Sequence, residues 1–237
     1  MKTKAIFFDK DGTLLDFNAL WGPRDESVVR AIARETKAEE GVGDALQALG
    51  ITDGKAAIDS LILWAPYDIL GATIWEALSH HGCTATKEQV IQMTYGFYKE
   101  FSHLGEVKPT YPSLRSDLRA LKNAGLKFVL VTTDISALAR QCLEELGIDD
   151  LFDAIYASDG KLPSKPNPAC ISDYLEKTGF SGDEVVMVGD AITDMEFAAN
   201  GGIRSIGIAS APGSREVLLG YTDTVIPDIS QLQQNLR

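Results

Sequence analysis

Two aspartates separated by one residue stand directly after a short apolar run near the start of the chain. The run is Ala5–Phe8, and the segment DKDGT at residues 9–13 follows it. Carboxylates with the spacing of Asp9 and Asp11 can face one loop cavity, where one acts as a nucleophile and the other as a proton donor. Gly12 allows a tight turn, and exposed amide groups there can hold phosphate oxygens. The pattern therefore predicts nucleophilic and acid–base chemistry on a substrate that carries a phosphate group.

The same segment has two other interpretations. It could be an ordinary acidic turn, and it also resembles part of a calcium-binding loop. An EF-hand loop lies between two helices and needs a distant glutamate. Here an apolar, strand-like run precedes the acids, so we discount the calcium loop.

A hydroxyl and an amine occur later in the chain. Thr132 comes directly after the apolar run Phe128–Val131, and its hydroxyl could donate to a phosphoryl oxygen. Lys165 lies in a loop that prolines stiffen, and its amine could neutralise phosphate charge. Lys161 is a nearby competitor. Taken singly, a threonine at a strand end and a lysine in a loop are more typical of ordinary structure than of catalysis.

A second acidic pair follows another apolar run. Asp190 comes after Val185–Val188, and Asp194 stands four residues further, in the expected first turn of a helix. Residues four apart on a helix face the same way. Magnesium takes few protein oxygens and keeps waters, so one carboxylate at a strand end suits it. The alternative is that these acids only complement the helix dipole.

The second half of the chain alternates strand-like and helix-like segments, which predicts an α/β fold with a Rossmann-like parallel sheet covered on both faces. Functional loops in such sheets lie at the carboxyl ends of the strands. The expected strands are Ala5–Phe8, Phe128–Val131, Ala154–Ala157, Glu184–Val188, Ile203–Ile208 and Asp223–Ile226.

The segment between the first two strands has helical spacing and little strand signal. Its expected helices are Arg24–Thr36, Gly43–Leu49, Lys55–Leu63, Leu70–His80 and Lys87–Ser102. We therefore expect residues 1–16 and 109–237 to form the α/β core domain. Residues 17–108 would form an inserted helical cap domain that could act as a lid.

Composition limits the partners. The formal net charge is -12 and the pI about 4.7, so the surface repels nucleic acid and anionic membranes, and neither is expected as a partner. A phosphate substrate would be repelled as well unless a cation reverses the local field. Three scattered cysteines and the absence of a signal-peptide-like or membrane-spanning run favour a cytoplasmic protein.

The order Asp-x-Asp, Thr, Lys, Asp, with each group at its own strand end, resembles the haloacid dehalogenase superfamily. It is most similar to the phosphoglycolate phosphatase branch, which has a helical cap after the first motif. The resemblance implies a nucleophilic Asp9 that forms an aspartyl-phosphate. It also implies that Asp11 acts as general acid and then general base, while Thr132 holds the phosphoryl group and Lys165 neutralises charge.

The resemblance further implies a magnesium ion, Mg²⁺, and a small phosphorylated metabolite as substrate. The metal ligands would be Asp9, Asp11 through its backbone carbonyl, Asp190 and Asp194. The predicted substrate-binding residues are Gly12, Thr13, Thr133, Trp21 and Arg24. The substrate itself and the cap residues that select it stay open, as does the oligomeric state, for which a homodimer is one option.

Three other functions are compatible with parts of this pattern. A phosphomutase shares all four core motifs and would return the phosphoryl group to the product. A receiver-type signalling switch also combines acids, Thr and Lys on a parallel sheet, but there the acids precede the other two. A non-catalytic scaffold is disfavoured because clustered carboxylates destabilise a fold without a metal. A hydrolase of small phosphate monoesters is the function that we expect.

Overall fold

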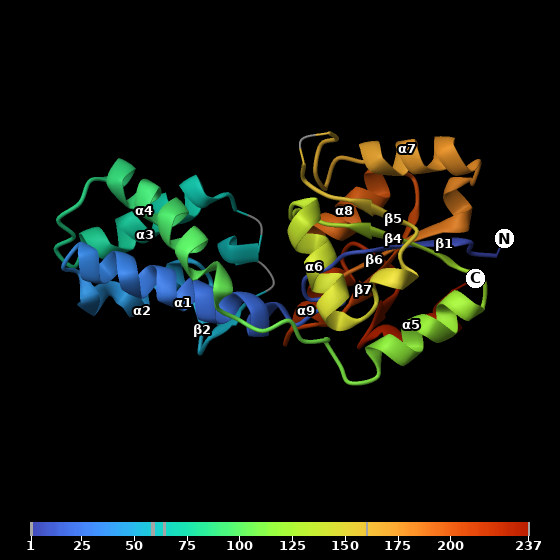
Figure 1. Cartoon of the computed structure of the whole chain (residues 1–237), viewed down its shortest axis with the longest axis horizontal. Helices are drawn as coiled ribbons and strands as arrows, with labels where there is room; N and C mark the ends of the chain where they lie inside the picture. Colours follow the sequence, from blue (N-terminus) through green and yellow to red (C-terminus); the bar gives the residue numbers. More distant parts are fainter. Residues whose placement is uncertain (1, 58–59, 64, 160, 237) are drawn as a thin grey trace. The chain divides into compact units, whose positions relative to one another are not determined.

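The strand that precedes the first acidic pair lies at the centre of a parallel sheet. The computed structural model describes every residue except 1, 58–59, 64, 160 and 237. Strand β1 (Ala5–Phe8) pairs in parallel with β4 (Lys127–Val131) on one side and with β6 (Val185–Gly189) on the other. Within the described residues the sheet has six strands in the order β5-β4-β1-β6-β7-β8 (Figure 1). The remaining strands are β5 (Ala154–Tyr156), β7 (Arg204–Ile208) and β8 (Val225–Ile226).

Alternating side chains of β1 enter two different hydrophobic cores, as the two-residue period of a strand requires. Ile6 and Phe8 pack with residues of α5 (Leu114–Asn123) and α6 (Ser136–Leu146). Ala5 and Phe7 pack with residues of α7 (Ala169–Thr178) and α8 (Ile192–Asn200). All four side chains are fully buried, and burial of each phenylalanine contributes roughly 1.5–3 kcal/mol. Both faces of the sheet are therefore covered, which confirms the predicted α/β architecture.

The strand order reverses beside β1. The chain runs from β1 to β4 and β5 on one side of the sheet, and then from β6 to β7 and β8 on the other. The crevice at such a reversal, outside the carboxyl ends of the strands, is where open α/β sheets bind ligands. The loops after β1, β4 and β6 all reach this crevice.

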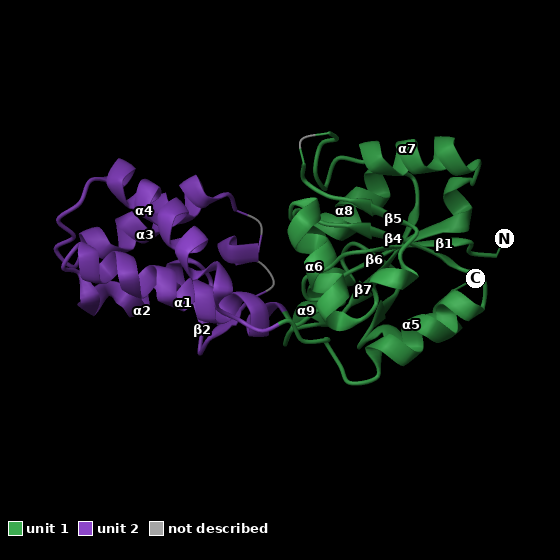
Figure 2. Cartoon of the chain, viewed as in Figure 1, with its two compact units in different colours: residues 1–16, 107–237 green, residues 17–106 purple. Residues whose placement is uncertain are grey.

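The chain forms two units by internal contacts, shown in green and purple in Figure 2. The first comprises Met1–Asp16 and Val107–Arg237, and the second is Phe17–Glu106. The second unit ends two residues before residue 108, the expected end of the insertion. The two units are hereafter the α/β unit and the helical unit.

The helical unit has a core of its own. Helices α1 (Phe17–Glu35), α2 (Val42–Ala48), α3 (Tyr67–Ser79) and α4 (Lys87–Glu100) surround one cluster of buried apolar side chains. Helix α4 begins at a capping box, in which the hydroxyl of Thr86 accepts from the Gln89 backbone and the Gln89 side chain accepts from the Thr86 backbone.

Helix α1 begins seven residues before the expected start at Arg24, although Pro23 lies within it. A proline inside a helix leaves the carbonyl four residues earlier without its amide donor. Here the Ala19 carbonyl accepts a hydrogen bond of 3.0 Å from the Glu106 N–H instead. A donor from the far end of the same unit therefore lets the helix pass through the proline.

The expected helix Lys55–Leu63 is wrong. Ile51–Thr52 (β2) and Lys55–Ala56 (β3) form a two-stranded antiparallel hairpin, and only Leu61–Leu63 is helical, as a 3₁₀ turn. Residues 58–59 of the expected helix lie outside the described residues. The turn residues Asp53 and Gly54 have φ of 50° and 71°, the backbone that an Asp-Gly hairpin turn needs. This local turn preference outweighs the helical spacing of the following residues.

Short elements complete the fold. These are α9 (Ser214–Leu218), α10 (Leu232–Asn235) and 3₁₀ turns at Glu39–Gly41, Phe101–His103, Asp149–Leu151, Gly182–Glu184 and Ile229–Gln231. Among the described residues, no helix combines the length and the apolar character that crossing a bilayer would require.

Candidate active site

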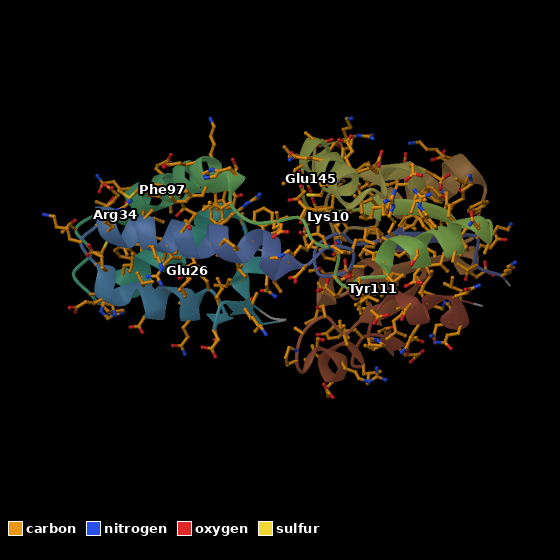
Figure 3. The ribbon with its side chains drawn as sticks, turned by 60° about the horizontal axis from the view of Figure 1, so that its bottom comes forward. Lys10, Glu26, Arg34, Phe97, Tyr111 and Glu145 are labelled. Atoms are coloured by element: carbon orange, nitrogen blue, oxygen red, sulfur yellow. The ribbon has the colours of Figure 1, made fainter. Side chains whose placement is uncertain are left out.

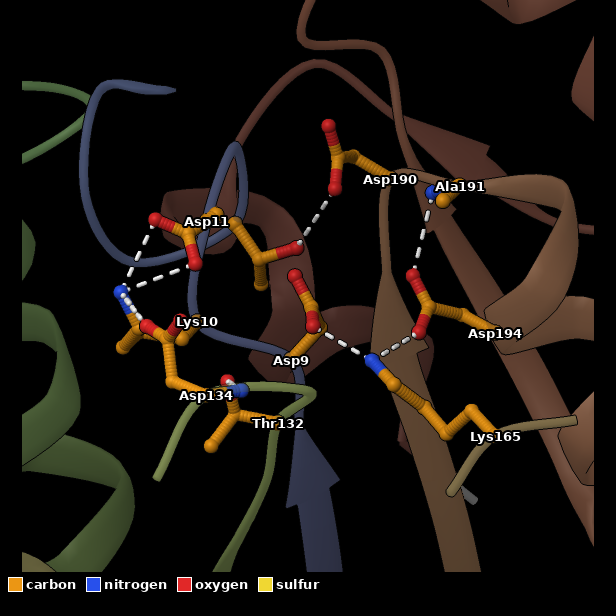
Figure 4. A network of polar contacts seen from close by, with 10 residues as sticks. Asp9, Lys10, Asp11, Thr132, Asp134, Lys165, Asp190, Ala191 and Asp194 are labelled. Atoms are coloured by element: carbon orange, nitrogen blue, oxygen red, sulfur yellow. Dashed lines mark hydrogen bonds and ion pairs between the residues drawn. The ribbon is translucent and has the colours of Figure 1, made fainter. Parts of the chain in front are cut away.

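Asp9 leaves the end of β1 and meets the ammonium group of Lys165. The Asp9 N–H still donates to the Val188 carbonyl, at 2.9 Å, so β6 fixes its backbone. Lys165 Nζ lies 2.5 Å from Asp9 Oδ1 and 2.6 Å from Asp194 Oδ1 (Figure 4). The lysine side chain is almost fully buried. Three segments that are far apart in sequence therefore meet in one ion-pair network.

Asp194 holds Lys165 in place. Its side chain is fully buried, and its second oxygen, Oδ2, accepts from the Ala191 N–H at 3.1 Å, at the start of α8. Both oxygens thus have protein donors. The lysine loop is also tied to the other end of α8, since Asn200 Nδ2 donates to the Pro166 carbonyl at 3.0 Å. Helix α8 consequently positions both the amine and its counter-ion.

Asp190 lies at the end of β6 and faces the turn after β1. Its Oδ2 accepts from Ser210 Oγ at 2.7 Å, and its Oδ1 from Thr13 Oγ1 at 3.4 Å. Gly12 has φ of 78°, and a Cβ added there would lie 2.0 Å from Asp190 Oδ2. Only glycine therefore fits between the two acidic segments. The Gly12 N–H donates to the Leu15 carbonyl at 2.8 Å, so this amide is engaged within the turn. Substrate binding by Gly12 and Thr13 stays a prediction.

Three carboxylates gather around one point. Asp9, Asp190 and Asp194 each offer an oxygen, and these oxygens lie within 4.8 Å of one another; they form the metal-compatible cluster found among the described residues. Carboxylate oxygens are the donors that magnesium prefers. The donors to Asp190 are two hydroxyl groups, which can rotate away from a bound cation, whereas Asp194 is held by the Lys165 ammonium and a backbone N–H. Asp9 and Asp190 are therefore the carboxylates best placed to act as ligands. The donor set fits a hard divalent cation.

Electrostatics support the same conclusion. Burial raises the pKa of Asp9 well above its usual value, and the neighbouring carboxylates add to the rise although Lys165 opposes it. Burial and the charge of Asp194 raise the pKa of Asp190 to about 7. Burial alone would lower the pKa of Lys165, but the charges of Asp194 and Asp9 raise it. Burial is the main cause for the two aspartates, and the neighbouring carboxylates add to it, whereas for Lys165 the carboxylates set the direction. A bound cation would offset the excess of negative charge.

The Asp11 carboxylate is paired with Lys10. Lys10 Nζ lies 2.9 Å from Asp11 Oδ1, 2.8 Å from Asp11 Oδ2 and 2.8 Å from Asp134 Oδ2. Burial lowers the pKa of Lys10, but the charges of Asp11 and Asp134 outweigh it and hold this pKa above its usual value. Asp11 therefore carries its own buried cation, separate from Lys165.

Thr132 is buried at the end of β4, and the structure fixes both its backbone and its hydroxyl. Its N–H donates to the Tyr156 carbonyl at 3.0 Å, and its Oγ1 accepts from the Asp134 N–H at 3.1 Å. With the oxygen engaged as acceptor, the hydroxyl proton can be directed toward a ligand. Thr133 is exposed beside it.

Trp21 and Arg24 lie in α1 of the helical unit. Arg24 is buried, its Nε donates to the Leu104 carbonyl at 2.6 Å, and its guanidinium carbon lies 4.9 Å from the centre of the Trp21 ring. These contacts are internal to the helical unit. Substrate binding by the two residues stays a prediction.

Three residues that contact the candidate site residues were not singled out from the sequence: Lys10, Asp134 and Ser210. For Lys10 there was a signal: it continues the Ile6, Phe8 alternation, which predicts a lysine directed into a core. Asp134 had a weaker one, as an acid two residues after Thr132. Ser210 had none, because nothing in the sequence relates its loop to Asp190.

Comparison with known proteins decides the family. The model of the haloacid dehalogenase-like hydrolases matches residues 3–202. The chain belongs to the haloacid dehalogenase-like hydrolase family. The phosphoglycolate phosphatase of Vibrio vulnificus strain YJ016 is 30% identical over 231 residues, covering 97% of this haloacid dehalogenase-like hydrolase and 94% of the relative. The family and this relative indicate an enzyme of the phosphatase type.

Solved structures share the fold of this haloacid dehalogenase-like hydrolase. A Bacillus subtilis protein assigned as a HAD hydrolase, with magnesium bound, aligns over 100% of both chains with a TM-score of 0.69 and 18% identity. A Thermotoga maritima protein assigned as a β-phosphoglucomutase aligns over 98% of both chains with a TM-score of 0.69 and 20% identity. At these identities the likeness establishes the fold alone.

Proposed function

We propose that the chain is a magnesium-dependent phosphatase of small phosphate monoesters that works through an aspartyl-phosphate on Asp9. The observation that carries this proposal is the meeting of Asp9 with Lys165 and Asp190 at the carboxyl ends of β1 and β6. A nucleophile needs a neighbouring cation when both it and its target are anionic.

The chain's own residues account for each step. The step begins with Asp11 protonated. An Asp9 oxygen attacks the phosphorus, the bond from phosphorus to the ester oxygen breaks, and that oxygen receives the proton of Asp11 as the alcohol leaves. Asp11, now a carboxylate, takes a proton from the water that attacks the aspartyl-phosphate, which releases phosphate and restores Asp9. Lys165 and the Thr132 hydroxyl would hold the phosphoryl oxygens throughout.

Asp9 and Asp190, with the backbone carbonyl of Asp11, would hold the magnesium ion. When bound, the ion supplies positive charge that the phosphoryl group needs in a protein of net charge -12. Asp194 serves this site by fixing Lys165, because its two oxygens are bonded to Lys165 and to the backbone of Ala191.

A small organic phosphate is the substrate class that we infer. A cavity of about 400 Å³ is lined by Thr132 and Lys165 together with Ser136, Tyr156 and Ser158. Asp9 and Asp190 do not line it, so it lies beside the proposed nucleophile. This volume lies in the range of small-molecule sites. The name of the Vibrio relative makes phosphoglycolate the first compound to test. We assign the helical unit the role of a cap, with Trp21 and Arg24 as its candidate contacts to the substrate.

Phosphate release from a panel of small phosphorylated metabolites, measured with and without magnesium, tests this function. Magnesium-dependent release that Asp9→Asn removes would support it. Interconversion of sugar phosphates without phosphate release would identify a phosphomutase instead. Absence of both reactions, in protein that is folded and loaded with magnesium, would contradict the proposal.

A further inference from the structure

The side chain of Lys10 is fully buried in the α/β unit, although it ends in a charged group. It follows Ile6 and Phe8 on the side of the sheet that α6 covers, where Nζ lies 4.0 Å from the sulfur of Cys142. Lysine is almost never fully buried unless its charge is paired. Figure 3 labels Lys10 among the side chains of this unit. Burial of the Lys10 ammonium therefore requires negatively charged groups close to it.

Those charges belong to two segments of the site. Both oxygens of Asp11 lie within 2.9 Å of Lys10 Nζ, and the Asp134 Oδ2 atom lies 2.8 Å from it. The Asp11 side chain is 21% exposed, so it is held from behind by the buried lysine while part of it still faces solvent. A group in that situation is fixed in direction and remains accessible to a substrate.

Asp134 connects Lys10 and Asp11 to the loop after β4, which carries Thr132. Its backbone N–H donates to Thr132 Oγ1, and its carboxylate pairs with Lys10 (Figure 4). Lys10 is therefore the link between the loop after β1, which carries Asp11, and the loop after β4, which carries Thr132. When Asp11 carries a proton and is neutral, the Asp134 carboxylate still balances the charge of the Lys10 ammonium.

We propose that Lys10 is a positioning residue that holds the Asp11 carboxyl group for proton transfer to the leaving alcohol. This role rests on the phosphatase function proposed above. In the step concerned, the electron pair of the breaking phosphorus–oxygen bond goes to the ester oxygen, and the proton of Asp11 joins that oxygen to give the alcohol. A poorly aimed Asp11 would slow this transfer and leave phosphate binding intact.

The dependence of the reaction on its leaving group separates this role from a merely structural one. An alkyl ester such as phosphoglycolate or glycerol 3-phosphate needs a proton on the departing oxygen, whereas p-nitrophenol leaves readily as an anion. Removal of Lys10 should therefore lower kcat/KM for the alkyl ester at least about tenfold more than for p-nitrophenyl phosphate. The readout is kcat/KM for the aryl ester divided by kcat/KM for the alkyl ester. The parameter kcat/KM reports only on the steps from substrate binding to departure of the alcohol.

The variants are chosen to keep the protein folded. Lys10→Met preserves the aliphatic stem but removes the ammonium that pairs with the partly buried Asp134 carboxylate. The double variant Lys10→Met with Asp134→Asn removes the charge of that carboxylate as well. Asp134→Asn alone is the matched control, because it retains the contacts of Lys10 with Asp11. Lys4→Met, at an exposed lysine that pairs with Glu184, controls for loss of a positive charge in the same unit.

A raised aryl-to-alkyl ratio in the double variant, with an unchanged ratio in Asp134→Asn and Lys4→Met, would support the role of Lys10. Equal losses on both substrates, or the same ratio change in Asp134→Asn, would overturn it while the phosphatase function stands. A wild-type protein that hydrolyses neither ester with magnesium would overturn the phosphatase function, and the role of Lys10 with it.

Discussion

Lys165 Nζ lies 2.5 Å from Asp9 Oδ1 although 156 positions separate the two residues in the chain. The same nitrogen contacts Asp194, so one buried ammonium joins two carboxylates at the centre of the proposed site. The chemistry proposed for Asp9 depends on this pairing, because an anionic nucleophile must approach an anionic phosphate.

Replacement of Lys165 should therefore harm turnover far more than replacement of its exposed neighbour in the same loop. We expect Lys165→Ala to lower kcat about 100-fold or more, because charge stabilisation in the transition state is lost. We also expect a lower melting temperature, because Asp194 is left buried and unpaired. Lys161→Ala is the control and should stay within about twofold of wild type. The reverse order of the two effects would show that the wrong lysine was chosen.

Asp9→Asn should abolish turnover while the protein stays folded. The amide keeps the shape of the side chain but cannot attack phosphorus, so we expect a loss of at least about 1,000-fold in kcat with p-nitrophenyl phosphate. Circular dichroism and the melting curve give the control for folding. Wild-type activity in this variant would remove Asp9 from its assigned role.

Magnesium should stabilise the protein as well as activate it. A ligand at 100 times its Kd adds about 2.7 kcal/mol to the free energy of unfolding, so the melting temperature should rise with magnesium. Asp190→Asn should weaken this rise strongly, whereas Asp183→Asn, at an exposed position of the same unit, should not. We expect chelator to silence the enzyme and calcium to restore it poorly. Full activity in excess chelator would contradict the metal's role.

Gly12→Ala should disturb Asp190 specifically. Its Cβ would lie 2.0 Å from Asp190 Oδ2, and its φ of 78° costs a residue with a side chain about 1–2 kcal/mol. Gly179 has φ of 69° with no heavy atom within 4 Å of an added Cβ, so Gly179→Ala is matched for backbone strain alone. Both variants should lose stability, but only Gly12→Ala should also lose magnesium affinity in a calorimetric titration. Equal magnesium affinity in the two variants would exclude this coupling.

Asp25 should make the helical unit less stable as pH rises toward neutrality. Burial raises the pKa of Asp25 to about 7, against an opposing hydrogen bond from Tyr98 and the charge of Arg24. The native state then holds a proton that the unfolded state releases near pH 4, so stability falls between about pH 4 and 7 and is level above that. The full loss is on the order of 4 kcal/mol.

Asp25→Asn should remove this dependence, since the amide oxygen can still accept from Tyr98. The variant should resemble wild type at pH 5 and be more stable at pH 8 in urea denaturation followed by tryptophan fluorescence. All three tryptophans fall between residues 17 and 106, so the signal reports on the helical unit. A stability difference that does not grow with pH would show that Asp25 is ionised in the folded protein.

Much of the α/β unit could be predicted because its signals are local. Short apolar runs bounded by polar residues and glycines marked β1, β4 and β6, since strands buried on both faces need side chains that are apolar on both. The expected end of each of these runs lies within one residue of the observed strand end. The candidate site residues followed from their place at these ends. The helical unit was less predictable, because Pro23 and the Asp53-Gly54 turn act through backbone hydrogen bonds and torsions that periodicity does not register.

The sequence by itself determined which groups could meet: acids, a threonine and a lysine at strand ends that a parallel sheet must bring to one edge. Only the tertiary structure decided how these groups divide their contacts. Asp194 is committed to Lys165 and to the start of α8, Asp11 to Lys10, and Asp190 to Ser210. Such pairings depend on side-chain directions and on burial, which raises the cost of every unpaired charge, and neither quantity is encoded in the spacing of residues along the chain.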